Sequence, residues 1–76
     1  MEIKWEDGFE IAVNAESGSV LVEANRQGLR SLAGILLSLA GGAPGEHVHR
    51  DEHNSLEDGS AELILERAED FGEARA

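Results

Sequence analysis

Three histidines and an aspartate lie close together in this 76-residue chain, in the run from His47 to His53. Along an extended strand, side chains two residues apart point to the same face. His47, His49, Asp51 and His53 could therefore line one edge of a strand. Imidazole nitrogens and carboxylate oxygens are common zinc ligands. The same residue types also occur on solvated surfaces that bind no metal, so the cluster has two interpretations.

In the first interpretation, a small metal-binding protein or a hydrolase-like domain uses His47, His49 and Asp51, with Glu62 or Glu66 as a further ligand. Catalysis would need a concave, desolvated pocket, which a chain of this length has little material to build. A nucleophilic mechanism is not indicated, because the chain has no cysteine and no Gly-x-Ser-x-Gly elbow. We therefore favour the second interpretation, a protein without catalytic residues, cofactor or required metal.

The composition indicates one acidic domain. Six Lys and Arg stand against sixteen Asp and Glu, which gives a formal net charge of -10. This charge repels phosphate backbones, so it argues against a nucleic-acid partner and favours either simple solubility or binding to a basic protein. The longest apolar segment, residues 29–40, is too short to cross a membrane, and the N-terminus lacks the pattern of a secretory signal. Together with the absence of cysteine, these features predict a cytoplasmic protein.

Alternating apolar and polar residues predict strands in the first third of the chain. Residues 1–6 and 9–14 are expected to form a hairpin, because apolar side chains fall on one face of each segment. A three-residue loop with Gly8 in the left-handed conformation would place Trp5 opposite Phe9.

A third strand is expected at residues 19–23, after a four-residue turn at 15–18. This turn would place Val13 opposite Val20 and keep the apolar residues of all three strands on one face.

A helix is expected after Asn25, which is a suitable N-cap, and before the glycines that follow Ala40. Ile35 and Leu39 widen its apolar stripe to about twice the arc that one core contact requires. The surplus predicts either deep burial under the sheet or a homodimer through Ile35 and Leu39. Gly28 and Gly34 predict close backbone packing. The residues expected to face the core are Leu29, Leu32, Ala33, Leu36, Leu37 and Ala40.

Two more strands are expected at residues 46–50 and 61–67, joined by a polar loop. Val48, Leu63 and Leu65 are expected to point inward. The chain is thus predicted to be an α+β protein with a small antiparallel-dominated sheet, in the order β-β-β-α-β-β, and one helix packed on one face.

The domain boundaries follow from this pattern. Residues 1–68 are expected to form a single α+β domain. Residues 69–76 are mainly charged or small and are expected to be an acidic tail that frays.

Three segments of the chain resemble the immunity protein 32 family of bacterial polymorphic toxin systems. They are the predicted helix, with Asn25-x-x-Gly28-Leu29 at its start, the run His47-x-His49-x-Asp51, and residues 59–66. The resemblance implies a small, non-enzymatic, cytoplasmic protein that neutralises a toxin encoded beside it. It supplies no catalytic residues.

Placement on the predicted sheet suggests where such a partner would bind. The outward face of the last two strands is mainly acidic, and an open face of this kind could contact a basic toxin domain. The residues that we expect to bind the partner are His47, His49, Glu62, Ile64 and Glu66.

Overall fold

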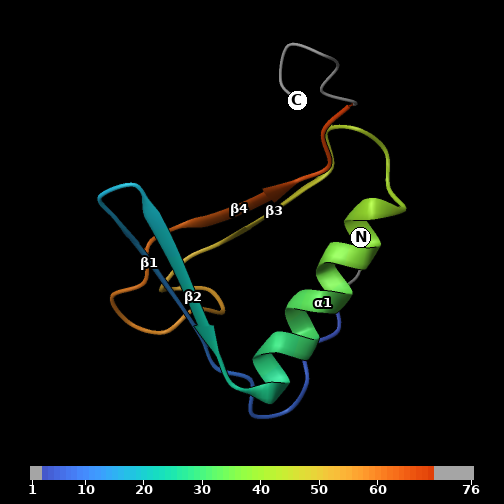
Figure 1. Cartoon of the computed structure of the whole chain (residues 1–76). Coiled ribbons are helices and arrows are strands. Elements are labelled where there is room, and N and C mark those ends of the chain that lie inside the picture. The colour runs from blue at the N-terminus through green and yellow to red at the C-terminus, as the bar shows by residue number, and fades with distance from the viewer. Residues whose placement is uncertain (1–2, 70–76) are drawn as a thin grey trace.

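The computed structural model describes residues 3–69 and shows an α+β fold with one helix and two small antiparallel sheets (Figure 1). β1 pairs with β2, and β3 pairs with β4. The predicted fold class is confirmed, but the single five-stranded arrangement is wrong, because the described residues form four strands. The elements are β1 (Ile11–Glu16), β2 (Ser19–Ala24), α1 (Arg26–Ala40), β3 (His47–Arg50) and β4 (Leu63–Glu66).

The predicted first strand is absent from residues 3–10. The turn itself forms: Gly8 has a φ of +80° and the rings of Trp5 and Phe9 stack with centroids 4.5 Å apart. The edge of β1 that such a strand would need is occupied, since the backbone N–H groups of Glu57 and Ala61 donate to β1 carbonyls at 2.8 and 2.6 Å. The N-terminal segment therefore packs against the start of α1 instead, through Asn25 and Ser31.

The hairpin of β1 and β2 is tighter than expected. Ser17 and Gly18 alone form the turn, with φ values of 46° and 85°, and Val13 pairs with Val22 instead of Val20. Two consecutive positive φ values match the right-handed twist of the flanking strands. Because the register differs by two residues, every side chain stays on its predicted face.

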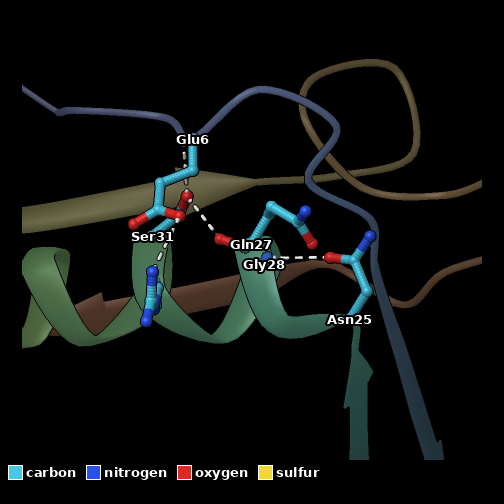
Figure 2. A network of polar contacts seen from close by, with 6 residues as sticks. Glu6, Asn25, Gln27, Gly28 and Ser31 are labelled. Atoms are coloured by element: carbon cyan, nitrogen blue, oxygen red, sulfur yellow. Dashed lines mark hydrogen bonds and ion pairs between the residues drawn. The ribbon is translucent and has the colours of Figure 1, made fainter.

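Asn25 caps α1 and also holds the N-terminal segment. Its Oδ1 accepts from the backbone N–H of Gly28 at 2.8 Å, as Figure 2 shows, and from that of Glu10 at 3.0 Å. Its Nδ2 donates to the carbonyl oxygen of Gly8 at 2.8 Å. One side chain therefore stabilises both the helix start and the segment that crosses it.

A second link joins this segment to the helix one turn later. The buried hydroxyl of Ser31 accepts from the backbone N–H of Glu6 at 3.0 Å and donates to the carbonyl oxygen of Gln27 at 2.8 Å (Figure 2). The absence of a side chain at Gly28 allows close contact as well, because a Cβ there would lie 2.5 Å from the carbonyl oxygen of Glu10. The predicted close packing is confirmed at Gly28. It is wrong at Gly34, where a Cβ would have no neighbour within 4 Å.

These contacts decide which face of α1 is buried. Ile35 and Leu39 are 2% and 4% exposed, whereas Leu29, Leu36 and Leu37 are 55%, 52% and 75% exposed. The prediction that Leu29, Leu36 and Leu37 face the core is wrong, whereas burial, one of the two alternatives for Ile35 and Leu39, is what the structure shows. The N-terminal segment bonds to the side of the helix that carries Ser31, so Ile35 and Leu39 are covered by this chain itself. They are not free to form a dimer interface.

The core consists of two small clusters of buried side chains. One contains Ile11, Val13 and Leu56, and the other contains Ile35, Leu39 and Val48. Trp5 and Leu32 pack against both clusters and connect them. Leu56 is 5% exposed although it belongs to the predicted polar loop, so this loop covers one end of the core.

The predicted tail, residues 69–76, lies outside the described residues apart from Glu69. The division into a domain and a tail stays a prediction. Within residues 3–69, no helix has both the length and the apolar character needed to cross a membrane.

Candidate functional site

The pairing of β3 with β4 places the predicted partner-binding residues on one face. His47 lies opposite Glu66, and His49 lies opposite Ile64. Val48 and Leu65 pair on the reverse face, where Val48 is buried in the core. We call the exposed side the outer face of β3–β4, and its residues are His47, His49, Glu62, Ile64 and Glu66.

The outer face combines an apolar centre with polar neighbours. Ile64 is 56% exposed. Beside it, His49 Nε2 lies 3.0 Å from Glu62 Oε2, and both side chains are about half exposed. His47 Nδ1 lies 3.1 Å from the carbonyl oxygen of Gly45, which orients this ring at the end of the strand. The outer face of β3–β4 thus presents carboxylates and imidazoles around one exposed isoleucine.

Asp51 and His53 do not continue this face. β3 ends at Arg50, and the chain then turns, with the backbone N–H of Asn54 donating to the Asp51 carbonyl oxygen at 3.0 Å. The Asp51 carboxylate accepts from the backbone N–H of His53 at 2.9 Å, so it stabilises the turn. In the part of the chain that the structure describes, no group of three or more His, Asp or Glu side chains could hold a metal ion.

The negative charge of the protein lies outside the helix. Residues 46–69, which include β3 and β4, contain eight carboxylates and two arginines, residues 1–24 contain six carboxylates and one lysine, and residues 25–45 contain two arginines and no carboxylate. Residues 46–69 thus have a net charge of -6, with His neutral, and charge of this sign attracts a basic surface. The helix, in contrast, carries two exposed arginines, Arg26 and Arg30, and no carboxylate.

An apolar groove lies on the other side of the molecule, between α1, β2 and β4. In Figure 1, α1 and the β1–β2 hairpin diverge from each other in a V, and β4 crosses between them. The groove has a volume of about 330 Å³. The sequence prediction missed it because it assigned these helix residues to the core. Its lining is entirely apolar and consists of Val22, Leu29, Leu32, Ala33, Leu36, Leu63 and Leu65.

The model of the family described as Immunity protein 32 matches residues 19–68 of this chain. The chain belongs to the immunity protein 32 family. This confirms the resemblance drawn from the sequence. The matched segment includes β2, α1, β3 and β4, so it contains every residue of the outer face and every residue that lines the groove. No curated protein and no solved structure gives a significant match to the chain.

Proposed function

We propose that this protein is a cytoplasmic immunity protein that binds and neutralises a basic bacterial toxin domain through the outer face of β3–β4. Membership of the immunity protein 32 family over residues 19–68 is the observation that carries the proposal. The mode of action is binding, without catalysis.

The charge of the protein supports a basic partner. A formal net charge of -10, with eight carboxylates between residues 46 and 69, would attract a positively charged domain to the protein, β3–β4 included. Steering of this kind raises association rates and weakens as salt screens the charges, over a Debye length of about 10 Å at 0.1 M ionic strength. Rapid association would let the protein bind the toxin before the toxin acts.

The composition of the outer face also suits a protein contact. Interfaces typically place an apolar anchor at the centre and polar groups at the rim. Ile64, half exposed between His49 and Glu62, could serve as the anchor. Glu62 and Glu66 could then accept hydrogen bonds from lysine or arginine side chains of the toxin.

The metal-binding or hydrolase-like alternative receives less support. Asp51 and His53 turn away from the strand that carries His47 and His49, and their nearest polar contacts stabilise the local turn. The two histidines that remain on the face lack a third ligand among residues 3–69.

Co-expression with the toxin domain encoded beside the gene tests the proposal, with cell survival as the measurement. The unmodified protein is expected to protect the cells. A double variant, His49→Ala with Glu62→Lys, is expected to lose protection and to bind the purified toxin at least about 100-fold more weakly, equivalent to about 2.7 kcal/mol. Binding by the unmodified protein should also weaken as salt is added.

The matched control is Asn14→Ala with Glu23→Lys, which makes the same charge change on exposed positions of the β1–β2 sheet. It is expected to protect as well as the unmodified protein. If the His49 and Glu62 variant is folded and still protects, the outer face is not the binding surface. If the unmodified protein neither binds nor protects, the immunity function is wrong for this toxin pair.

A further inference from the structure

Strand β2 has one edge that no other described segment covers. Among residues 3–69, β2 pairs with β1 along its whole length and with no other strand. The opposite edge of β1 is occupied, because the segment 57–61 donates two backbone N–H groups to the carbonyl oxygens of Ile11 and Val13. The hairpin is therefore bonded on its β1 side and open on its β2 side.

The open hydrogen-bonding groups of this edge belong to Val20 and Val22. In an antiparallel pair, successive residues alternate between bonding to the partner strand and pointing away from it. Val22 lies opposite Val13, whose carbonyl oxygen points away from β2 and accepts from Ala61. Val22 therefore points away from β1, and so does Val20, two residues before it. Within residues 3–69, no segment outside the hairpin bonds to the backbone of either valine.

This edge lacks the features that usually prevent the addition of a strand. Natural sheet edges are commonly protected by lysine, proline or a bulge. β2 contains neither lysine nor proline, and its six residues pair with β1 without interruption. Val20 and Val22 are 68% and 39% exposed. β2 is also longer than β3 and β4, which have four residues each, so its edge is the best suited to accept a further strand.

The apolar groove lies beside this edge. Val22 lines the groove together with Leu29 and Leu36 of α1. A strand paired with β2 would direct every second side chain to the face that carries Val22, which is the groove side. Glu23 belongs to the opposite face. Because the groove lining is entirely apolar, a charged side chain there would be buried without a partner. The added strand must therefore be apolar at alternate positions.

The net charge of the protein decides which molecule supplies this strand. Each copy of the chain has a formal net charge of -10, so a second copy would be repelled. The toxin proposed above is basic and would be attracted. The groove and β2 also lie within residues 19–68, the segment that the immunity protein 32 model matches.

We propose that an extended segment of the toxin, apolar at alternate positions, adds as a strand to the edge of β2 and fills the groove with its apolar side chains. Its backbone would bond to Val20 and Val22, which is the general mode of strand addition. This inference rests on the proposed function, because the toxin is the partner, and it adds a second contact to the outer face of β3–β4. An extended segment could reach β2 while the folded part of the toxin contacts the outer face.

Amide hydrogen exchange of the full-length protein, measured by NMR with and without the purified toxin domain, is the first test. The N–H groups of Val20 and Val22 are expected to exchange rapidly in the free protein. In the complex, their exchange is expected to slow at least about 10-fold, because each N–H would donate to the added strand. The N–H of Leu21 should be protected in both states, since it bonds to β1.

The outcomes separate this inference from the proposed function. A complex in which Val20 and Val22 stay unprotected overturns the inference and leaves the proposed function intact. If no complex forms, both are wrong. Slow exchange at the two valines in toxin-free protein that sediments as a dimer would mean that a second copy occupies the edge, and the inference would be wrong.

A proline variant tests the edge directly. Val20→Pro removes only the outward N–H, which β1 does not use, so the hairpin is expected to fold. Toxin binding is expected to weaken at least about 10-fold, because one hydrogen bond is lost and the ring meets the added strand. Val20→Thr keeps the N–H and is the control, expected to bind within about 2-fold of the unmodified protein. Equal binding by the control and a folded proline variant would overturn the inference.

A pair of glutamate variants tests the groove, and it applies even if the proline variant does not fold. Leu36 lines the groove, whereas Leu37 is exposed on the same helix outside the groove lining. Leu36→Glu is expected to weaken toxin binding at least about 10-fold, because the added strand would bury an unpaired carboxylate. Leu37→Glu makes the same charge change and is expected to stay within about 2-fold of the unmodified protein. Equal binding by the two variants would show that the toxin does not use the groove.

Discussion

Asn25 Oδ1 lies 2.8 Å from the backbone nitrogen of Gly28, and this hydrogen bond caps the start of α1. Asn25 caps the helix and also binds the backbone of Glu10 and Gly8. Gly28, with no side chain, allows the carbonyl of Glu10 to pass close to the helix. The two residues therefore act together. They set how α1 packs, and hence which of its leucines remain exposed.

Asn25→Ala is expected to lower the free energy of unfolding by about 1–2 kcal/mol, because it removes the N-cap and the bonds to the N-terminal segment. Denaturant unfolding followed by circular dichroism measures the change. Asn14→Ala, at an exposed strand position, is the control and is expected to change stability by less than about 0.5 kcal/mol. Equal effects of the two substitutions would contradict the assigned role of Asn25.

Alanine substitutions at two glycines of α1, Gly34 and Gly28, are expected to change the stability of the protein in opposite directions. Gly34→Ala is expected to stabilise the protein by about 0.5–1 kcal/mol, since alanine is the better helix former and nothing lies within 4 Å. Gly28→Ala is expected to destabilise it by about 1–3 kcal/mol, because its methyl group would overlap the Glu10 carbonyl and Ile11. Thermal unfolding of both variants tests this, and a gain in stability at both positions would disprove the close packing at Gly28.

The buried face of α1 can be checked by truncating large side chains. Ile35→Ala is expected to cost about 2–4 kcal/mol, because Ile35 is 2% exposed in the core. Leu37→Ala, at 75% exposure, is expected to cost less than about 0.5 kcal/mol. A larger loss at Leu37 than at Ile35 would mean that the opposite face of the helix is buried.

Stability is expected to be independent of metal. Of the histidines between residues 47 and 53, only His47 and His49 share a strand face, and they have no third ligand within residues 3–69. A chelator should therefore leave the unfolding temperature unchanged. Added zinc should raise the unfolding temperature only at the high concentrations at which zinc binds weakly to surface histidines. A large loss of stability with the chelator would restore the metal-binding interpretation.

Local features of the sequence were sufficient for several elements. Asn25 could be identified as an N-cap, and Gly8 adopts the positive φ predicted for it. Alternation along β3 and β4 also placed His49 and Ile64 together on the exposed side. Each of these features depends on neighbouring residues or on a period of two, so the sequence alone determines it.

The tertiary structure decided everything that depends on competition between distant segments. Residues 3–10 alternate like a strand, yet residues 57–61 occupy the edge of β1, and Asn25 and Ser31 bind the N-terminal segment. The apolar residues of α1 surround most of the helix, so periodicity could not identify the buried side. The hydroxyl of Ser31 and the missing side chain of Gly28 set the rotation of the helix, and this left Leu29, Leu36 and Leu37 exposed.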